Sequence, residues 1–200
     1  MRRLAVLALL AWLAALPAAA QTAQPGTRDE PSRLAVAVFG RICLLGLGDV
    51  GAIDSMLAPG NEFGFVEVPQ DIAETLLRGR RGTVRALRRP GLGTVMVVAG
   101  ADGICSVWSQ WAEADAVRRH MAAMVERGGL QGGGTLVPAG VKDNAGSRTF
   151  EWKLMPEGWY AHDLGRRTGD DGRRPVLVTA ALWPPGERPF EGLLSAARGR

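Results

Sequence analysis

The sequence has few of the residues that metal-binding sites and redox centres use. The 200 residues include two cysteines, Cys43 and Cys105, and two histidines, His120 and His162. Neither a C-x-x-C pair nor an H-E-x-x-H motif occurs, and these are spacings that redox thiols and zinc sites use. We therefore expect no metal and no cofactor.

Lysine is also scarce. The 24 basic residues are 22 arginines and two lysines, Lys142 and Lys153, against 20 acidic residues, so the formal net charge is +4. A strong arginine bias beside much alanine and glycine is typical of a GC-rich genome. The basic balance does not indicate an anionic polymer as ligand, and we expect no nucleic-acid partner.

Long hydrophobic runs are missing beyond the amino terminus. The run Leu4–Leu16 has 13 residues, fewer than the ~20 that a membrane-spanning helix needs. Two arginines precede it, and a proline and three alanines follow, which is the pattern of a cleavable export signal. We expect a signal peptide over residues 1–20, with an uncleaved anchor as the alternative, and a disordered leader over 21–29. The mature protein is then periplasmic or secreted, without a transmembrane segment.

The expected export predicts whether the two cysteines are bonded or free. In an oxidising compartment an even pair indicates a disulfide, so we expect a Cys43–Cys105 bond, with two free buried thiols as the alternative. Closing a loop of this size stabilises a fold by about 4 kcal/mol in the chain-entropy model.

The spacing of apolar residues changes along the chain from helical to strand-like. Helical spacing predicts four helices, over Glu30–Leu45, Val50–Leu57, Pro69–Leu77 and Ala112–Arg127, the last strongly amphipathic. Strand patterns between turn residues predict six strands, over Thr83–Arg88, Thr94–Ala99, Ile104–Trp108, Arg148–Leu154, Trp159–Arg166 and Pro175–Trp183. The glycine-rich start of Gly128–Ser147 and the lack of a pattern after it indicate irregular structure.

This order of elements predicts an α+β domain with a mainly antiparallel sheet of about six strands. Two three-strand meanders surround one amphipathic helix, and the other helices are N-terminal. We expect a single domain over residues 30–190 and a tail over 191–200 with room for a short helix.

Sequence motifs for catalysis are weak. Gly46–Gly51 matches G-x-G-x-x-G, but strands here follow strands rather than alternating with helices, so we interpret it as a helix stop and a turn. No G-x-S-x-G elbow occurs. A serine hydrolase would have to assemble Ser106, Ser109 or Ser147 with His162 across the sheet.

Surface chemistry offers several candidate contacts. Six arginines lie between Arg78 and Arg89 without interleaved aromatics, and we interpret them as solvated side chains, with an anionic partner as the alternative. Trp159 and Tyr160 follow a turn and point to opposite sides of their strand. The candidate ligand contacts are Trp159, Tyr160, His162 and Arg85.

Short motifs give the chain a resemblance to a class of small exported proteobacterial proteins. They are Phe39-x-x-x-Cys43 on a helix, Gly103-x-Cys105-x-Val107 on a strand, the amphipathic helix, and a closing Phe150-x-Trp152-x-Leu154 strand. The resemblance implies a helix-to-sheet disulfide and an envelope location, and it brings no activity with it.

These features together favour an exported envelope protein that acts as a binding or accessory module. Its partner would be an envelope protein, a lipid or a glycan, met by an open sheet face or by residues 128–147. The alternatives are a small periplasmic hydrolase with His162 as its base, and a structural envelope protein.

Overall fold

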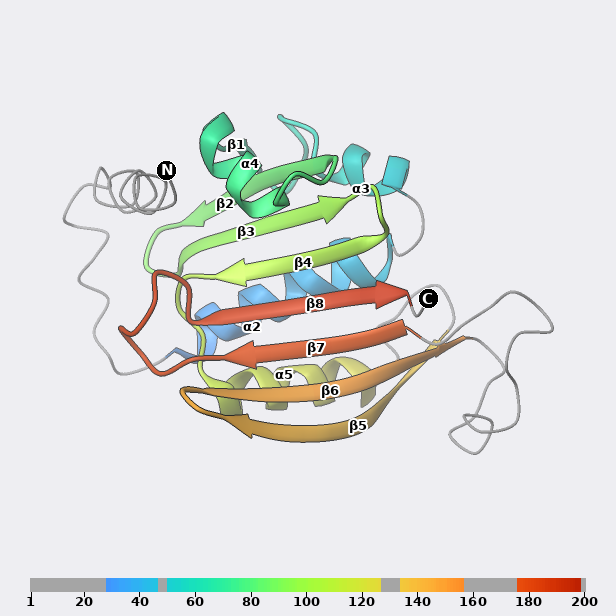
Figure 1. The fold of residues 1–200 in the computed structure, drawn as a ribbon, viewed down its shortest axis with the longest axis vertical. Coiled ribbons are helices and arrows are strands. Elements are labelled where there is room, and N and C mark those ends of the chain that lie inside the picture. The colour runs from blue at the N-terminus through green and yellow to red at the C-terminus, as the bar shows by residue number, and fades with distance from the viewer. Residues whose placement is uncertain (1–27, 47–49, 127–133, 157–175, 199–200) are drawn as a thin grey trace.

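The computed structural model describes residues 28–46, 50–126, 134–156 and 176–198. These residues form one antiparallel sheet of eight strands in the order β1-β2-β3-β4-β8-β7-β6-β5 (Figure 1). The prediction of about six strands in two meanders is therefore wrong. Three of the eight strands were not predicted, and the predicted strand Trp159–Arg166 lies outside the described residues.

The first helical segment is α2 (Asp29–Val38), which continues into the π-helix η2 (Phe39–Leu44). The sequence predicted one helix over Glu30–Leu45, and the structure widens its last turns: the Leu45 amide donates to the Gly40 carbonyl, five residues back, at 3.2 Å. Such π-helical turns shift which side chains face the core. Here Ile42, Cys43 and Leu44 are all buried in a row.

Two short helices and four strands complete the first half of the sheet. The helices α3 (Val50–Met56) and α4 (Gln70–Leu77) match the prediction within two residues. The strands are β1 (Val66–Glu67), β2 (Gly82–Arg89), β3 (Gly93–Gly100) and β4 (Ile104–Ser109). The predicted first meander is thus present, and the two-residue strand β1 extends it at the edge.

The second half begins with α5 (Ala114–Glu126), followed by β5 (Gly134–Asn144), β6 (Ser147–Pro156), β7 (Val176–Leu182) and β8 (Gly192–Arg198). The prediction that residues 128–147 are irregular is wrong from Gly134 onward, where β5 begins. Pro138 and a register shift between Pro138 and Gly140 hide the strand pattern of β5, and pairing with β6 imposes the strand.

The C-terminal segment lies at the centre of the sheet rather than in a tail. Strand β8 pairs with β4 on one side and with β7 on the other. Each half of the chain therefore sends its last strand to the middle, and β4 and β8 join the halves. The expected short helix after residue 190 is wrong, because two neighbouring strands satisfy the β8 backbone.

Both long helical segments cover the same face of the sheet (Figure 1). Successive strand residues point to opposite faces, so Val107, Val178 and Leu194 face α2 and α5 and are fully buried. The helices approach closely at Gly40, where an added Cβ would lie 2.6 Å from Sδ of Met124.

The Cys43–Cys105 disulfide joins η2 to β4 inside this core, with both side chains buried. The predicted pairing is confirmed, and the bond is compatible with an oxidising compartment. In the described part of the chain, no helix is long and apolar enough to span a membrane.

Candidate functional site: the uncovered sheet face

The face of the sheet opposite α2 and α5 has a helix over only part of it. Helix α4 lies over β2 and β3, where Leu76 packs near Ala86 and Met96 in a small second core. Figure 1 shows no described helix over β4, β8 and β7 on that side. We call their side chains there the uncovered face: Ile104, Ser106, Trp108, Leu177, Thr179, Ala181, Leu193, Ser195 and Ala197.

None of these nine side chains is charged. Ser106 is buried by its neighbours at 8% exposure and Leu177 is 43% exposed, while the other seven are half-buried. Solvent-facing sides of antiparallel sheets usually carry polar and charged residues. An uncharged surface in the middle of the sheet is therefore the feature of this fold that most resembles a contact site.

Hydroxyl groups form the middle row of the uncovered face. Ser106 on β4 lies opposite Ser195 on β8, and Ser195 lies opposite Thr179 on β7. Each hydroxyl can donate one hydrogen bond and accept others. The row continues to Glu151 on β6, whose carboxylate accepts a hydrogen bond from Lys142 at 2.7 Å.

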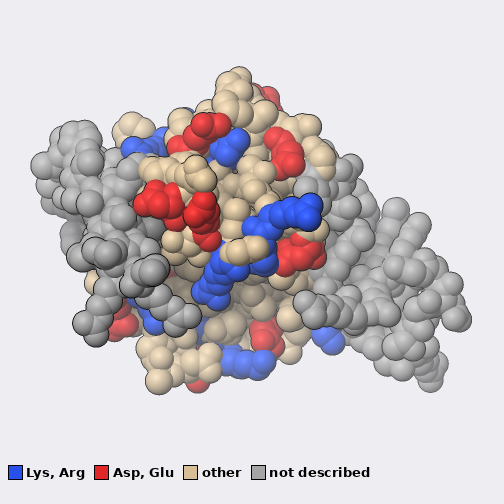
Figure 2. Space-filling model, turned by 45° about the horizontal axis from the view of Figure 1, so that its top comes forward, with Lys and Arg blue, Asp and Glu red and all other residues tan. Residues whose placement is uncertain are grey.

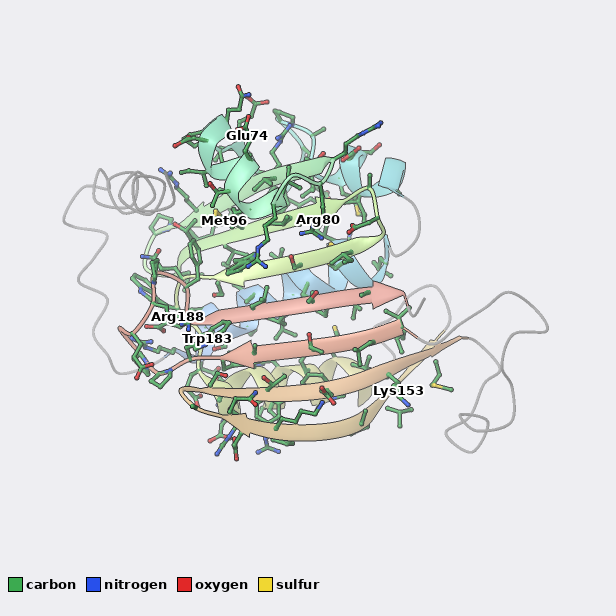
Figure 3. The ribbon with its side chains drawn as sticks, in the orientation of Figure 1. Glu74, Arg80, Met96, Lys153, Trp183 and Arg188 are labelled. Atoms are coloured by element: carbon green, nitrogen blue, oxygen red, sulfur yellow. A yellow bond between two sulfur atoms is a disulfide. The ribbon has the colours of Figure 1, made fainter. Side chains whose placement is uncertain are left out.

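Aromatic and basic side chains border the face. The Trp108 ring meets the Phe190 ring edge-on, with centroids 6.2 Å apart. The Arg188 guanidinium carbon lies 4.8 Å from the centroid of the Trp183 ring. Figure 3 shows these last two near the β7–β8 connection, and Lys153 toward the other end of the strands. The two ends of the face therefore differ in chemistry.

Glu191 links the β7–β8 connection to two distant segments by hydrogen bonds. Its buried carboxylate accepts hydrogen bonds from the Arg28 guanidinium, from the Gly186 amide at 2.9 Å and from the Ala112 amide at 3.4 Å. Burial lowers the pKa of Arg28 from its ordinary value. This buried carboxylate has its partners within the protein, so we assign it a structural role.

A second polar cluster lies between α2 and α5, on the helix-covered side. Arg119 donates to Oδ1 of Asp29 at 2.9 Å, and Nε2 of His120 is 3.2 Å from the same oxygen. The hydrogen bond from Arg119 holds the pKa of Asp29 below its usual value, with a further contribution from the nearby His120. The cluster links the start of α2 to α5.

The predicted ligand contacts do not gather on the uncovered face. Arg85 lies in register with the core residue Val97, so it belongs to the helix-covered side. It donates to the Val84 carbonyl at 3.0 Å, and its Nη2 is 3.5 Å from Oε1 of Glu67. Trp159, Tyr160 and His162 lie outside the described residues.

The serines considered for hydrolysis lie in different surroundings. Ser106 is on the uncovered face, while buried Ser109 donates to the Trp111 carbonyl at 2.8 Å. Ser147 begins β6 in the hairpin with β5. Because His162 is not among the described residues, the hydrolase reading stays a prediction. In the described ranges, no group of three His, Cys, Asp or Glu side chains could hold a metal ion.

The arginine-rich segment has partners within the protein at several positions. Arg80 lies 3.2 Å from Asp102, and Arg89 donates to the Phe63 carbonyl at 2.9 Å. Among the residues drawn in colour in Figure 2, basic side chains form a short band with acidic ones beside it. That side of the molecule thus presents mixed charge.

Comparison with protein-family models, with curated proteins and with solved structures finds no match for this chain.

The uncovered face was not located from the sequence, although one signal for it was present. In Ile104–Trp108 the core residues Cys105 and Val107 alternate with Ile104, Ser106 and Trp108. The same alternation continues in β8, and there it was missed because residues 191–200 were read as a tail.

Proposed function

We propose that this protein is an exported binding module of the cell envelope that holds its ligand or partner on the uncovered face. The observation that carries the proposal is the set of nine uncharged side chains on β4, β8 and β7, the part of that face over which no described helix packs. Exposed uncharged surface is favourable to bury on binding. The hydroxyl row of Ser106, Ser195 and Thr179 adds hydrogen-bonding groups that fix orientation.

Export to the periplasm or beyond is part of the same proposal. The amino-terminal pattern of residues 1–20 supports it. So does the Cys43–Cys105 bond, because disulfides persist in oxidising compartments. Cell fractionation with amino-terminal sequencing tests it, and we expect mature protein that begins at Gln21 in the exported fraction. Uncleaved protein confined to the cytoplasm would contradict it.

A charge placed on the uncovered face tests the binding role. Ala181 is half-buried on the uncovered face, and Ala122 is exposed on α5, on the other side. We expect Ala181→Glu to abolish chemical cross-linking of the tagged protein to its envelope partner, and Ala122→Glu to preserve it, with both variants folded by circular dichroism. Equal cross-linking of the two variants would contradict the proposed site.

A further inference from the structure

One row of side chains on the uncovered face consists of three apolar residues, and a lysine on the next strand follows them. Ile104 lies opposite Ala197, Ala197 opposite Leu177, and Leu177 opposite Lys153 on β6. With neighbouring strands about 4.8 Å apart, the row is roughly 14 Å long. Leu177 is 43% exposed, so the row presents apolar surface beside a cation.

Lys153 is the cation of this row, and among the described residues no ion pair involves it. The other lysine of the chain, Lys142, also lies toward this side, but its Nζ is 2.7 Å from Oε1 of Glu151. A lysine stem can lie along apolar surface while its ammonium group reaches outward. Charge complementarity at this end of the row therefore favours a negatively charged group.

The size of the uncharged surface favours a small ligand. Three strands about 4.8 Å apart, each contributing about six residues at roughly 3.4 Å, give an area of roughly 300 Å². Stable protein interfaces bury about 800 Å² on each partner. The surface is thus too small for a stable interface with a second copy of this chain.

From these observations we infer that the uncovered face binds an anionic amphiphile, a molecule with one acyl chain and one negatively charged head group. The acyl chain lies along Ile104, Ala197 and Leu177, and the head group pairs with the Lys153 ammonium. The inference rests on the proposed function, because it names the ligand class of the same face.

Isothermal titration calorimetry of the purified protein tests the inference with three probes. Decanoate has both the chain and the charge, 1-decanol has the chain alone, and butyrate has the charge with little chain. We expect decanoate to bind and 1-decanol to bind roughly twofold to fivefold more weakly, because an ion pair at an exposed lysine is weak. Butyrate should bind more weakly still, because most of the apolar contact is lost. Equal binding of decanoate and decanol would overturn the role of Lys153, and absence of decanoate binding would overturn the inference.

Two variants and one control locate the ligand. Lys153→Gln should weaken decanoate binding roughly twofold to fivefold, since the lysine is exposed, and Leu177→Asn should weaken it by removing apolar contact. The double variant Lys142→Gln with Glu151→Gln removes the neighbouring ion pair at constant net charge, and it should bind decanoate as the unmodified protein does. All four substituted positions are at the surface or half-buried, and melting temperatures verify folding. Unchanged binding by Lys153→Gln would contradict the inference.

The inference and the proposed function can fail separately. If Ala181→Glu abolishes cross-linking to an envelope protein while decanoate does not bind, the amphiphile is wrong and the binding face stands. If decanoate binds and Lys153→Gln does not weaken it, the face binds apolar molecules without the head-group contact, and the inference is again wrong.

Discussion

Cys43 in η2 and Cys105 in β4 are separated by 62 positions, yet their Cα atoms lie 5.3 Å apart. The bond connects the first helical segment to one of the two strands that join the halves of the sheet. The chain between the two cysteines includes α3, α4 and three strands, β1 to β3. A single covalent link therefore constrains most of the first half of the molecule.

Removing this bond should destabilise the protein strongly. For the double variant Cys43→Ala with Cys105→Ala, we expect the free energy of unfolding to fall by about 4 kcal/mol, because the unfolded chain gains the freedom of a long loop. Urea unfolding measures the change, and unmodified protein with reductant is the control. A loss below about 1 kcal/mol would show that the link constrains little.

Glu191 should contribute stability through its charge. Glu191→Gln leaves the Arg28 guanidinium partly buried without its carboxylate partner. We expect the free energy of unfolding to fall by about 3 kcal/mol, because breaking a buried ion pair leaves one charge without compensation. The matched control is Glu187→Gln, an exposed position in the same connection, where a change within about 0.5 kcal/mol is expected. Similar unfolding free energies for the two variants would argue against the fastening role of Glu191.

Close packing at Gly192 predicts a steric cost for any side chain. A Cβ there would lie 2.6 Å from the Ala112 Cβ and 3.3 Å from Cδ1 of Leu182. We expect Gly192→Ala to lower the free energy of unfolding by about 1–3 kcal/mol. In Gly140→Ala the nearest atom is Oε2 of Glu151 at 3.7 Å, so that variant should unfold close to the unmodified protein. The reverse order of stabilities would contradict the packing described for β8.

The carboxylate of Asp29 predicts a pH dependence. Its pKa is lowered in the folded protein, chiefly by the hydrogen bond from Arg119, so it stabilises the fold at pH values above its unfolded pKa. That stabilisation is lost as the pH falls through the folded pKa. We expect Asp29→Asn to be less stable than the unmodified protein at neutral pH and to approach it in acid. A difference that is constant from pH 7 to pH 2 would show that Asp29 does not act through its charge.

Local sequence patterns were sufficient to predict some elements of the fold. Glycine turns at Gly91 and Gly103, both with positive φ, separate the strands of the first meander, and these strands were predicted within a residue or two. The apolar stripe of α5 was also clear, since Val117 and Met121 are fully buried. In both cases neighbours in the sequence decide the structure.

Long-range pairing decides the elements that were missed. Strand β5 contains Pro138 and a register shift, and it depends on its hairpin partner β6. Strand β8 is short and rich in small residues, and it is a strand because β4 and β7 lie on either side of it. The uncovered face is built from these pairings, so the sequence alone could not place it. The candidate contacts were chosen instead for their chemistry, and Arg85 is on the opposite side.

Site-specific photo-cross-linking in the native envelope tests the central claim most directly. A photoreactive residue at Thr179 lies in the middle of the uncovered face, and one at Ala122 lies on exposed α5. We expect a single defined adduct from position 179 that is missing from position 122, at equal protein levels. Adducts from position 122 alone, or identical adducts from both positions, would contradict the claim that the uncovered face is the binding surface.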